Sequence, residues 1–277
     1  MENLEIKSPC KINLGLNILR KREDGYHDIE TIFYPLDFFD TIYFEKSDHT
    51  SFDSNSNGLI NQKSNLILDA KTALESYVGN TLNVKIRLDK RVMIGAGLGG
   101  GSSNAAFTLK ALNQLYDLNL SDSALLNIAS GIGSDVAFFI YSKPAFAISR
   151  GEKLEFIDLK IESPILIVNP GIHISTKWAY QNISPSIPKE NLKDIIRIHS
   201  NDIKSWKGKI TNDFEQVVFK AHPEIEGIKN KLYDLGASFS LMSGSGSTVY
   251  GIFEDSEAAA NSEIYFKEKY YTFLQGF

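Results

Sequence analysis

Hydrophobic and polar residues alternate with a period of two near the start of the chain. Ile12, Leu14, Leu16 and Ile18 fall on one side of this pattern, and Lys, Asn and Gly fall on the other. The alternation predicts a β-strand with one buried face. Residues 29–45 are rich in β-branched and aromatic side chains, which predicts one or two further strands.

Helical spacing of apolar residues appears further along the chain. The first helix is expected to begin at Ser64 or Asn65 and to end at Gly79, and a later one to begin at Ser121 or Asp122. The expected helices cover residues 66–78, 104–116, 121–132, 223–235 and 255–270. Further strands are expected over residues 83–89, 145–149 and 164–170, and two more within 238–253.

The order of these elements indicates the fold class. Strands and helices mix without strict alternation, which favours an α+β fold over a doubly wound parallel sheet. Residues 47–64 are polar and are expected to form a loop or a frayed hairpin. A change of composition at 150–161 predicts two domains, residues 1–155 and 156–277.

Composition and charge exclude several classes of protein. The 277 residues are 43% hydrophobic and 23% charged, which is the balance of an ordinary globular protein rather than a disordered or fibrous one. The net charge of −5 lacks the basic footprint of a nucleic-acid-binding protein. The single cysteine, Cys10, allows no intramolecular disulfide, and the N-terminus does not look like a signal peptide. We therefore expect a cytoplasmic protein without a membrane segment.

The segment GAGLGGGSSN, residues 95–104, is the clearest local signal. Five of its first seven residues are glycine, so the backbone can approach a ligand closely and turn its N–H groups toward it. The helix expected after it adds a partial positive charge and unpaired N–H donors. Ser102 and Ser103 are candidates to cap this helix or to donate to a phosphate. The segment predicts a phosphate site; the alternative is a flexible turn.

The type of phosphate loop follows from what surrounds it. A Walker A loop would end in Gly-Lys-Ser or Gly-Lys-Thr, and no lysine is present. Gly95, Gly97 and Gly100 match the G-x-G-x-x-G spacing of dinucleotide-binding proteins. However, the preceding strand is amphipathic and a second helix follows the first, which disfavours that type of site.

Two further residues are candidates for chemistry. Lys11 lies with Asn13 on the polar face of the first strand, so it is either a solvated edge residue or a functional cation. Asp135 follows the segment Gly-Ile-Gly-Ser, so it is either a helix N-cap or, beside a phosphate loop, a general base or metal ligand.

Three segments, in this order, resemble the three motifs of the GHMP kinases. They are PCKINLGL, then GAGLGGGSSNAA with GSDVAFF after it, and MSGSGSTVYG. The segment LRKREDGYHDIETIF is similar to the substrate loop of the GHMP kinases that act on 4-diphosphocytidyl-2-C-methyl-D-erythritol. The resemblance implies the two-domain GHMP kinase fold, with an N-terminal domain like domain 2 of ribosomal protein S5 and a ferredoxin-like C-terminal domain. Met93 stands where the family commonly has proline, and Cys10 where it commonly has alanine.

The resemblance also implies a reaction and its catalytic residues. ATP would donate its γ-phosphoryl group to the 2-hydroxyl of the methylerythritol unit. Asp135 would accept the hydroxyl proton, and Lys11 would hold that carboxylate ionised and offset the charge of the phosphate. Mg²⁺ would be held mainly by ATP phosphates and water, with no protein metal ligand. The residues implied in ATP binding are Met93, Ile94, Gly95, Ala96, Gly97, Leu98, Gly99, Gly100, Gly101, Ser102 and Ser103.

A substrate site is implied in the same way. Tyr26 would stack on cytosine and His27 would hydrogen-bond its edge, while Asn13 would contact the polyol end. Tyr180 aligns with a second stacking residue and has Trp178 as a rival. The remaining implied contacts are Thr176 and the turn Gly244, Ser245 and Gly246, whose N–H groups would meet the substrate's diphosphate. Without the resemblance, the sequence favours Tyr26 as a residue that packs over a hairpin, and it leaves open that the Gly/Ser turn is an ordinary hairpin turn.

Two other functions remain open at this point. One is a GHMP kinase for a different alcohol, such as homoserine or mevalonate, and the other is an inactive nucleotide-binding regulator. The expected partner is a small cytidine-diphosphate substrate, with no nucleic acid or membrane. The expected assembly is a monomer or a weak homodimer.

Overall fold

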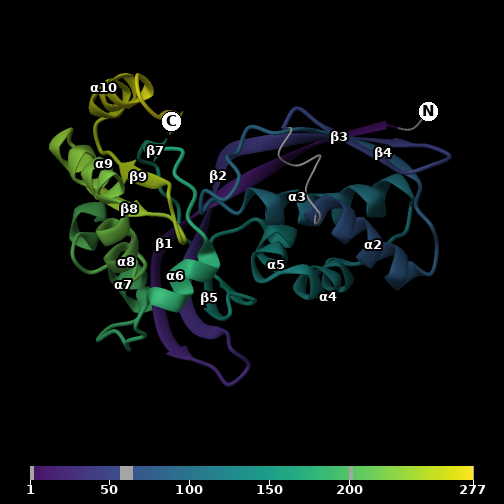
Figure 1. Cartoon of the computed structure of the whole chain (residues 1–277), viewed down its shortest axis with the longest axis horizontal. Helices are drawn as coiled ribbons and strands as arrows, with labels where there is room; N and C mark the ends of the chain where they lie inside the picture. Colours follow the sequence, from purple (N-terminus) through teal and green to yellow (C-terminus); the bar gives the residue numbers. More distant parts are fainter. Residues whose placement is uncertain (1–2, 57–64, 200–201, 277) are drawn as a thin grey trace. The chain divides into compact units, whose positions relative to one another are not determined.

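The computed structural model describes residues 3–56, 65–199 and 202–276 (Figure 1). The fold is α+β, as predicted. The strands are β1 Asn3–Lys21, β2 His27–Lys46, β3 Ser51–Ser54, β4 Val84–Asp89, β5 Ala145–Ser149, β6 Lys153–Phe156, β7 Ile165–Asn169, β8 Phe239–Met242, β9 Val249–Ile252 and β10 Tyr271–Gln275. The helices are α2 Leu66–Val78, α3 Gly100–Leu115, α4 Asp122–Ile132, α5 Ser134–Tyr141, α6 Thr176–Asn182, α7 Leu192–His199, η1 Ile203–Trp206, α8 Glu215–Ala221, α9 Pro223–Asp234 and α10 Ser256–Lys267.

The chain forms two compact units, each assembled from separate segments. Unit 1 contains Met1–Cys10, Pro35–Ile94 and Gly99–Lys143; unit 2 contains Lys11–Tyr34, Gly95–Leu98 and Pro144–Phe277. The long strands β1 and β2 contribute residues to both units, and so does the glycine segment. Because the segments interleave, this partition does not test a single boundary along the chain, and the division at residue 155 stays a prediction.

Unit 1 packs helices against strands. Residues 41–46 of β2 pair antiparallel with β4, and β4 pairs parallel with β3. Helices α2, α3, α4 and α5 pack on one another and lie on one side of these strands in Figure 1. Alternate residues of β4 are buried, which is the half-exposed strand that its sequence predicts.

Unit 2 contains a four-stranded antiparallel sheet in the order β10-β7-β9-β8. Helices α9 and α10 pack on it, and its core includes Phe214, Val218, Ile228, Leu232 and Phe266. In the same unit, residues 29–33 of β2 pair antiparallel with β5, which pairs with β6.

Most helix ends match the sequence signals. Asn65 caps α2 through its side chain, Gly79 ends that helix in the left-handed conformation, and Ser121 caps α4. Asp255 caps α10, and Gly236 follows α9 with a φ of +100°. The alternative start at Ser64 lies outside the described residues.

Several local predictions were wrong. β1 has two buried faces rather than one, because its polar side chains pair inside the fold, as Asn13 does with Thr31 and Asn17 with Glu30. Residues 51–54 of the expected loop form β3, whose polar side chains gave no alternating signal. The short strands β6 and β10 were not predicted. Among the described residues, no helix is long and apolar enough to cross a membrane.

Candidate functional site

The helix that follows the glycine segment begins earlier than the sequence indicated. α3 begins at Gly100, preceded by Gly99 with a φ of +68° and without a side-chain cap. Ser102 and Ser103 therefore lie inside the first turn, so neither of them is the N-cap. The first N–H groups of a helix have no intrahelical partner and carry a partial positive charge, which suits an anion.

Ser103 faces the interior of unit 1. Its side chain is fully buried, and its Oγ lies 2.7 Å from Ser8 Oγ. Ser8 Oγ also lies 2.9 Å from Asn104 Oδ1. In this arrangement the Ser103 side chain ties α3 to β1, while its backbone belongs to the helix start.

A buried carboxylate holds the chain just before the glycine segment. Asp40 accepts hydrogen bonds from Arg91 N at 2.7 Å, Val92 N at 2.8 Å and Lys90 Nζ at 2.5 Å. Burial lowers the pKa of the Lys90 ammonium, and the charge of Asp40 opposes this. Asp40 was not predicted, because a lone acid within a strand carries no motif.

Asp135 is the second residue of α5 and is partly buried. The residue that caps this helix is Gly133, so Asp135 is not the N-cap that was one of its two predicted roles. Its other predicted role, a general base or metal ligand, stays a prediction.

Lys11 is buried in unit 2 against the glycine segment. Its side chain is 3% exposed, and Nζ donates to Asn13 Oδ1 at 2.5 Å and to Gly97 O at 3.4 Å. The Phe33 ring centroid lies 5.0 Å from Nζ. These contacts exclude the solvated edge residue that was one alternative for Lys11. A buried ammonium beside a phosphate loop is a fixed positive charge for an anionic ligand.

The Gly/Ser turn between β8 and β9 meets the same glycine segment. Ser243 Oγ donates to Gly97 O at 2.9 Å and accepts from Asn13 N at 3.2 Å, and Thr248 N donates to Ala96 O at 3.3 Å. A Cβ on Gly97 would lie 2.0 Å from Ser243 O, so only glycine allows this approach. Unit 2 therefore joins three distant segments, and the turn is more than a hairpin connection.

The aromatic candidates in unit 2 are arranged around His27. Its ring stacks on Tyr180 with centroids 5.0 Å apart and planes 20° apart, and Phe214 meets the edge of Tyr180 at 4.9 Å. Burial and the charge of Lys21 lower the pKa of His27, which favours its neutral form. Trp178 and Tyr180 are both partly buried against the same hydrophobic core, so the choice between them stays a prediction.

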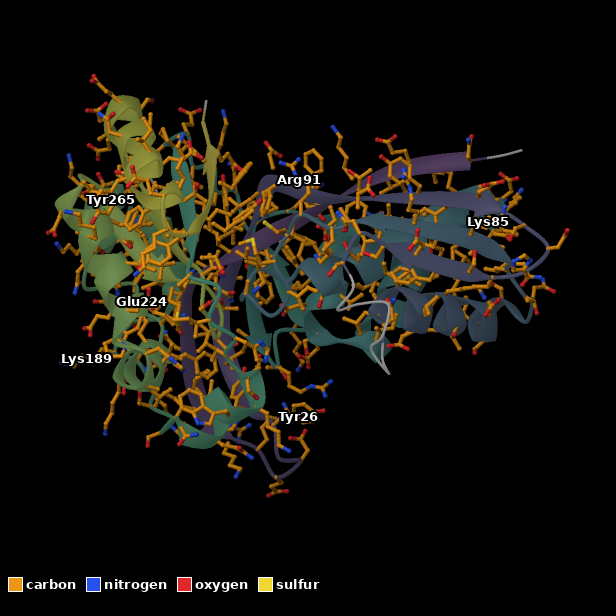
Figure 2. All side chains as sticks on the ribbon, turned by 45° about the horizontal axis from the view of Figure 1, so that its top comes forward. Tyr26, Lys85, Arg91, Lys189, Glu224 and Tyr265 are labelled. Atoms are coloured by element: carbon orange, nitrogen blue, oxygen red, sulfur yellow. The ribbon has the colours of Figure 1, made fainter. Side chains whose placement is uncertain are left out.

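Tyr26 lies in the loop that joins β1 and β2 and extends outward in Figure 2. Its side chain is 58% exposed, and the Arg150 guanidinium lies 4.9 Å from its ring centroid. Thr176 and Ser245 are brought together, with their hydroxyl oxygens 2.9 Å apart. Arg150 and Phe214 were not predicted, because nothing in their local sequence marks them.

Sequence models of one known family match both halves of the chain. The sequence model described as GHMP kinases N terminal domain matches residues 65–143, and the one described as GHMP kinases C terminal matches residues 190–271. A 4-diphosphocytidyl-2-C-methyl-D-erythritol kinase of Parabacteroides distasonis is 44% identical over 88% of this chain and 90% of its own. A kinase with the same name from Chlorobium phaeobacteroides is 39% identical over 98% of this chain and 96% of its own.

The chain belongs to the 4-diphosphocytidyl-2-C-methyl-D-erythritol kinases of the GHMP kinase family. A crystal structure of a 4-(cytidine 5'-diphospho)-2C-methyl-D-erythritol kinase matches with a TM-score of 0.82 and 29% identity, over 98% of each chain. The predicted GHMP kinase fold is thereby confirmed. The roles of individual residues are not tested by these likenesses.

Proposed function

We propose that the chain transfers the γ-phosphoryl group of ATP to the 2-hydroxyl of 4-diphosphocytidyl-2-C-methyl-D-erythritol, a step of the non-mevalonate isoprenoid pathway. The observation that carries this proposal is the buried Lys11 ammonium against the glycine segment at Gly97. Family membership and the aromatic stack of His27 on Tyr180 supply the choice of substrate.

ATP is proposed to bind along residues 93–103. The start of α3 supplies N–H donors and a positive partial charge, and glycines with positive φ at positions 95, 97 and 99 let the backbone turn its donors toward phosphate oxygens. Arg91 and Val92 are fixed by Asp40, so the segment begins from a rigid point.

Mg²⁺ is proposed to arrive with ATP. The described residues hold no group of three or more His, Cys, Asp or Glu side chains suited to a metal. Mg²⁺ keeps several waters and is commonly bound through phosphates and one or two carboxylates, so the donor chemistry of this chain fits an ion held mainly by ATP. Bound there, it would neutralise phosphate charge.

Asp135 and Lys11 are the proposed catalytic residues. Phosphoryl transfer passes through a loose transition state, so positioning and charge stabilisation dominate. An ordinary aspartate has a pKa of about 3.9, far below that of an alcohol, so Asp135 would orient the hydroxyl and accept its proton only as the new bond forms. Lys11 would offset the charge that develops on the transferred group.

The proposed substrate contacts lie in unit 2, at both ends of the cytidine diphosphate. Tyr26 and Tyr180 would stack on the cytosine ring, with His27 hydrogen-bonding its edge. In the turn Gly244–Gly246, Gly244 and Ser245 would donate backbone N–H groups to the diphosphate, with Thr176 beside Ser245. Gly246 N instead donates to Ser243 O at 3.0 Å, so its predicted N–H contact is not supported. Asn13 would meet the polyol end through its side chain, which in this structure pairs with Lys11 and Thr31.

A substrate panel tests the proposal directly. ADP release would be measured with the cytidyl substrate, homoserine and mevalonate, each at saturating ATP and Mg²⁺. We expect turnover with the cytidyl substrate at least a hundredfold above the others, since sites built to hydrogen-bond a substrate reject analogues by about 10⁴–10⁵-fold. Preference for another alcohol would contradict the choice of substrate, and ATP binding without turnover of any of them would contradict the kinase itself.

A further inference from the structure

The segment Asn212–Glu215 contacts separate parts of the candidate site in unit 2. Asn212 is 2% exposed, and its Nδ2 donates to Met242 O at 2.7 Å and to Gly244 O at 2.8 Å. Its Oδ1 accepts from Phe214 N at 3.0 Å. One buried amide therefore holds two carbonyl groups of the segment that forms the Gly/Ser turn.

The same segment is itself anchored to β1. Leu16 N donates to Thr211 O at 2.8 Å, and Asp213 N donates to Leu16 O at 2.9 Å. Asp213 Oδ2 accepts from Ile18 N at 2.7 Å. Asn212 thus projects from a backbone whose position is fixed on both sides.

Glu215 completes the attachment to the turn. Its Oε1 accepts from Met242 N at 2.9 Å, and its Oε2 pairs with Lys229 at 2.6 Å. Both backbone groups of Met242, the last residue of β8, are therefore held by side chains from this one segment.

The direction of the Gly244 carbonyl decides where the next N–H points. The peptide bond between Gly244 and Ser245 is trans, so the carbonyl of Gly244 and the N–H of Ser245 point in opposite directions. Because the carbonyl points at the buried Asn212 amide, the N–H of Ser245 points away from it. Gly244 has a φ of +56°, a conformation that lets this peptide turn sharply.

We propose that Asn212 is a positioning residue that aims the Ser245 N–H at the diphosphate of the substrate. Asn212 holds the carbonyl of Gly244 toward the interior. The N–H of Ser245 therefore points outward, toward the proposed site of the diphosphate. This inference rests on the proposed function, which assigns the turn to the diphosphate.

Phe214, two residues after Asn212, contacts one of the aromatic residues proposed for the cytosine end of the substrate. Phe214 meets the ring edge of Tyr180 with planes 87° apart, and Tyr180 stacks on His27. Two residues of one segment, Asn212 and Phe214, thus contact the groups proposed for the two ends of the ligand. Substituting Asn212 and Phe214 one at a time therefore distinguishes an effect at the diphosphate end from an effect at the cytosine end.

The experiment compares CDP with cytidine as probes. Binding of each is measured by calorimetry in the presence of saturating ADP, which occupies the nucleotide site at the glycine segment. The variant is Asn212→Leu, whose side chain has the same number of heavy atoms and the same branching but lacks the donors and the acceptor of the amide. We expect the preference of the protein for CDP over cytidine to fall about tenfold, while cytidine binds as to the wild type.

Two matched variants show whether this effect is specific. Asp213→Asn keeps an oxygen that accepts from Ile18 N, so its CDP preference should equal that of the wild type. Phe214→Leu should weaken cytidine and CDP by the same factor, which leaves the preference unchanged. If Asn212→Leu does not fold in a thermal melt, Asn212→Ser replaces it, and a hydroxyl that serves one carbonyl should give a smaller fall in the preference.

Each remaining outcome contradicts a particular statement. A folded Asn212 variant that keeps the full CDP preference overturns the positioning role of Asn212. An equal loss of cytidine and CDP in that variant overturns it as well, since the effect would then be general. A wild type that binds CDP no better than cytidine overturns instead the assignment of the turn to the diphosphate.

Discussion

The anion sites proposed for units 1 and 2 would present backbone N–H groups by different constructions. In unit 1 the donors belong to the start of α3, a 16-residue helix without a side-chain cap. In unit 2 they belong to a short turn whose carbonyls are held by Asn212 and whose Ser243 side chain contacts Gly97. A helix orders its own first turn, whereas the turn depends on buried polar side chains from distant parts of the sequence.

The candidate catalytic side chains differ in the same way. Asp135 occupies the first turn of a helix in unit 1. Lys11 lies on a strand in unit 2 and is buried among Asn13, Gly97 and Phe33. Substitutions at either residue should therefore change chemistry, whereas substitutions in the aromatic residues of unit 2 should change the binding of a particular ligand.

The largest effect is expected for Asp135→Asn. The amide cannot accept the hydroxyl proton, and proton transfer by a positioned group is worth about 10²–10⁴-fold in rate. We expect kcat to fall by that factor with ATP affinity retained, measured by ADP release and by calorimetry. A thermal melt checks that the variant stays folded. Turnover within a few-fold of the wild type would remove Asp135 from the mechanism.

The second effect concerns the stability of unit 1. Asp40→Asn removes the negative charge that Lys90 faces and leaves an ammonium that is 7% exposed without it. Breaking a buried pair in this way costs about 3–5 kcal/mol of unfolding free energy. Urea denaturation measures this cost, and Asp53→Asn on the nearby strand β3 serves as a control that should stay within about 0.5 kcal/mol of the wild type. A loss below about 1 kcal/mol for Asp40→Asn would show that the pair contributes little.

Asp135 and Asp40 differ in whether the sequence alone could predict them. The glycine segment, Lys11 and Asp135 could be predicted because they stand in compact motifs. Asp40 and Asn212 could not, because each acts on backbone groups about 30 to 50 residues away and leaves no local pattern. The motifs thus identify groups proposed to face ligands, and the structure adds the groups that hold those motifs in place.

The fold was predictable to a similar degree. Helix caps such as Asn65 and Ser121 have local causes and were correct. The two buried faces of β1 depend on tertiary partners of Asn13 and Asn17, which no period of two can indicate. The short strand β3 also depends on its partner β4 rather than on its own residues.

The third prediction tests the close approach within unit 2. Gly97→Ala places a Cβ 2.0 Å from Ser243 O at a φ of +78°, so backbone must move. The left-handed conformation alone costs an alanine about 1–2 kcal/mol, and the contact adds to this. We expect kcat/KM to fall about a hundredfold. Gly227→Ala in α9 is the control, because its Cβ meets nothing within 4 Å and activity should be unchanged. Similar activity in both variants would contradict the approach of the two segments.

The fourth prediction concerns the cytosine site of unit 2. Base stacking on an aromatic ring is worth roughly 1–3 kcal/mol, so Tyr26→Ala and Tyr180→Ala should each raise KM for the cytidyl substrate about tenfold. The KM for ATP should change little, and Tyr180→Phe should be nearly silent because it keeps the ring. Tyr77→Ala, which removes an exposed tyrosine from α2 in unit 1, is the control. If Trp178→Ala raises the KM for the cytidyl substrate strongly and Tyr180→Ala does not, the second stacking residue is Trp178 rather than Tyr180.

The smallest effect is the pH dependence that His27 gives to unit 2. Burial and the charge of Lys21 lower the pKa of His27 from 6.5 in the folded state. Well above pH 6.5 the ring is neutral in both states and adds no pH dependence. As pH falls below 6.5, the unfolded state takes up the proton first, so the folded state loses stability until the folded pKa is passed. The melting temperature of the wild type should therefore fall more between pH 7.5 and 5.5 than that of His27→Gln. Parallel curves for the two proteins would show that His27 titrates alike in the folded and unfolded states. The stack of His27 on Tyr180 would then add no sensitivity to acid to unit 2.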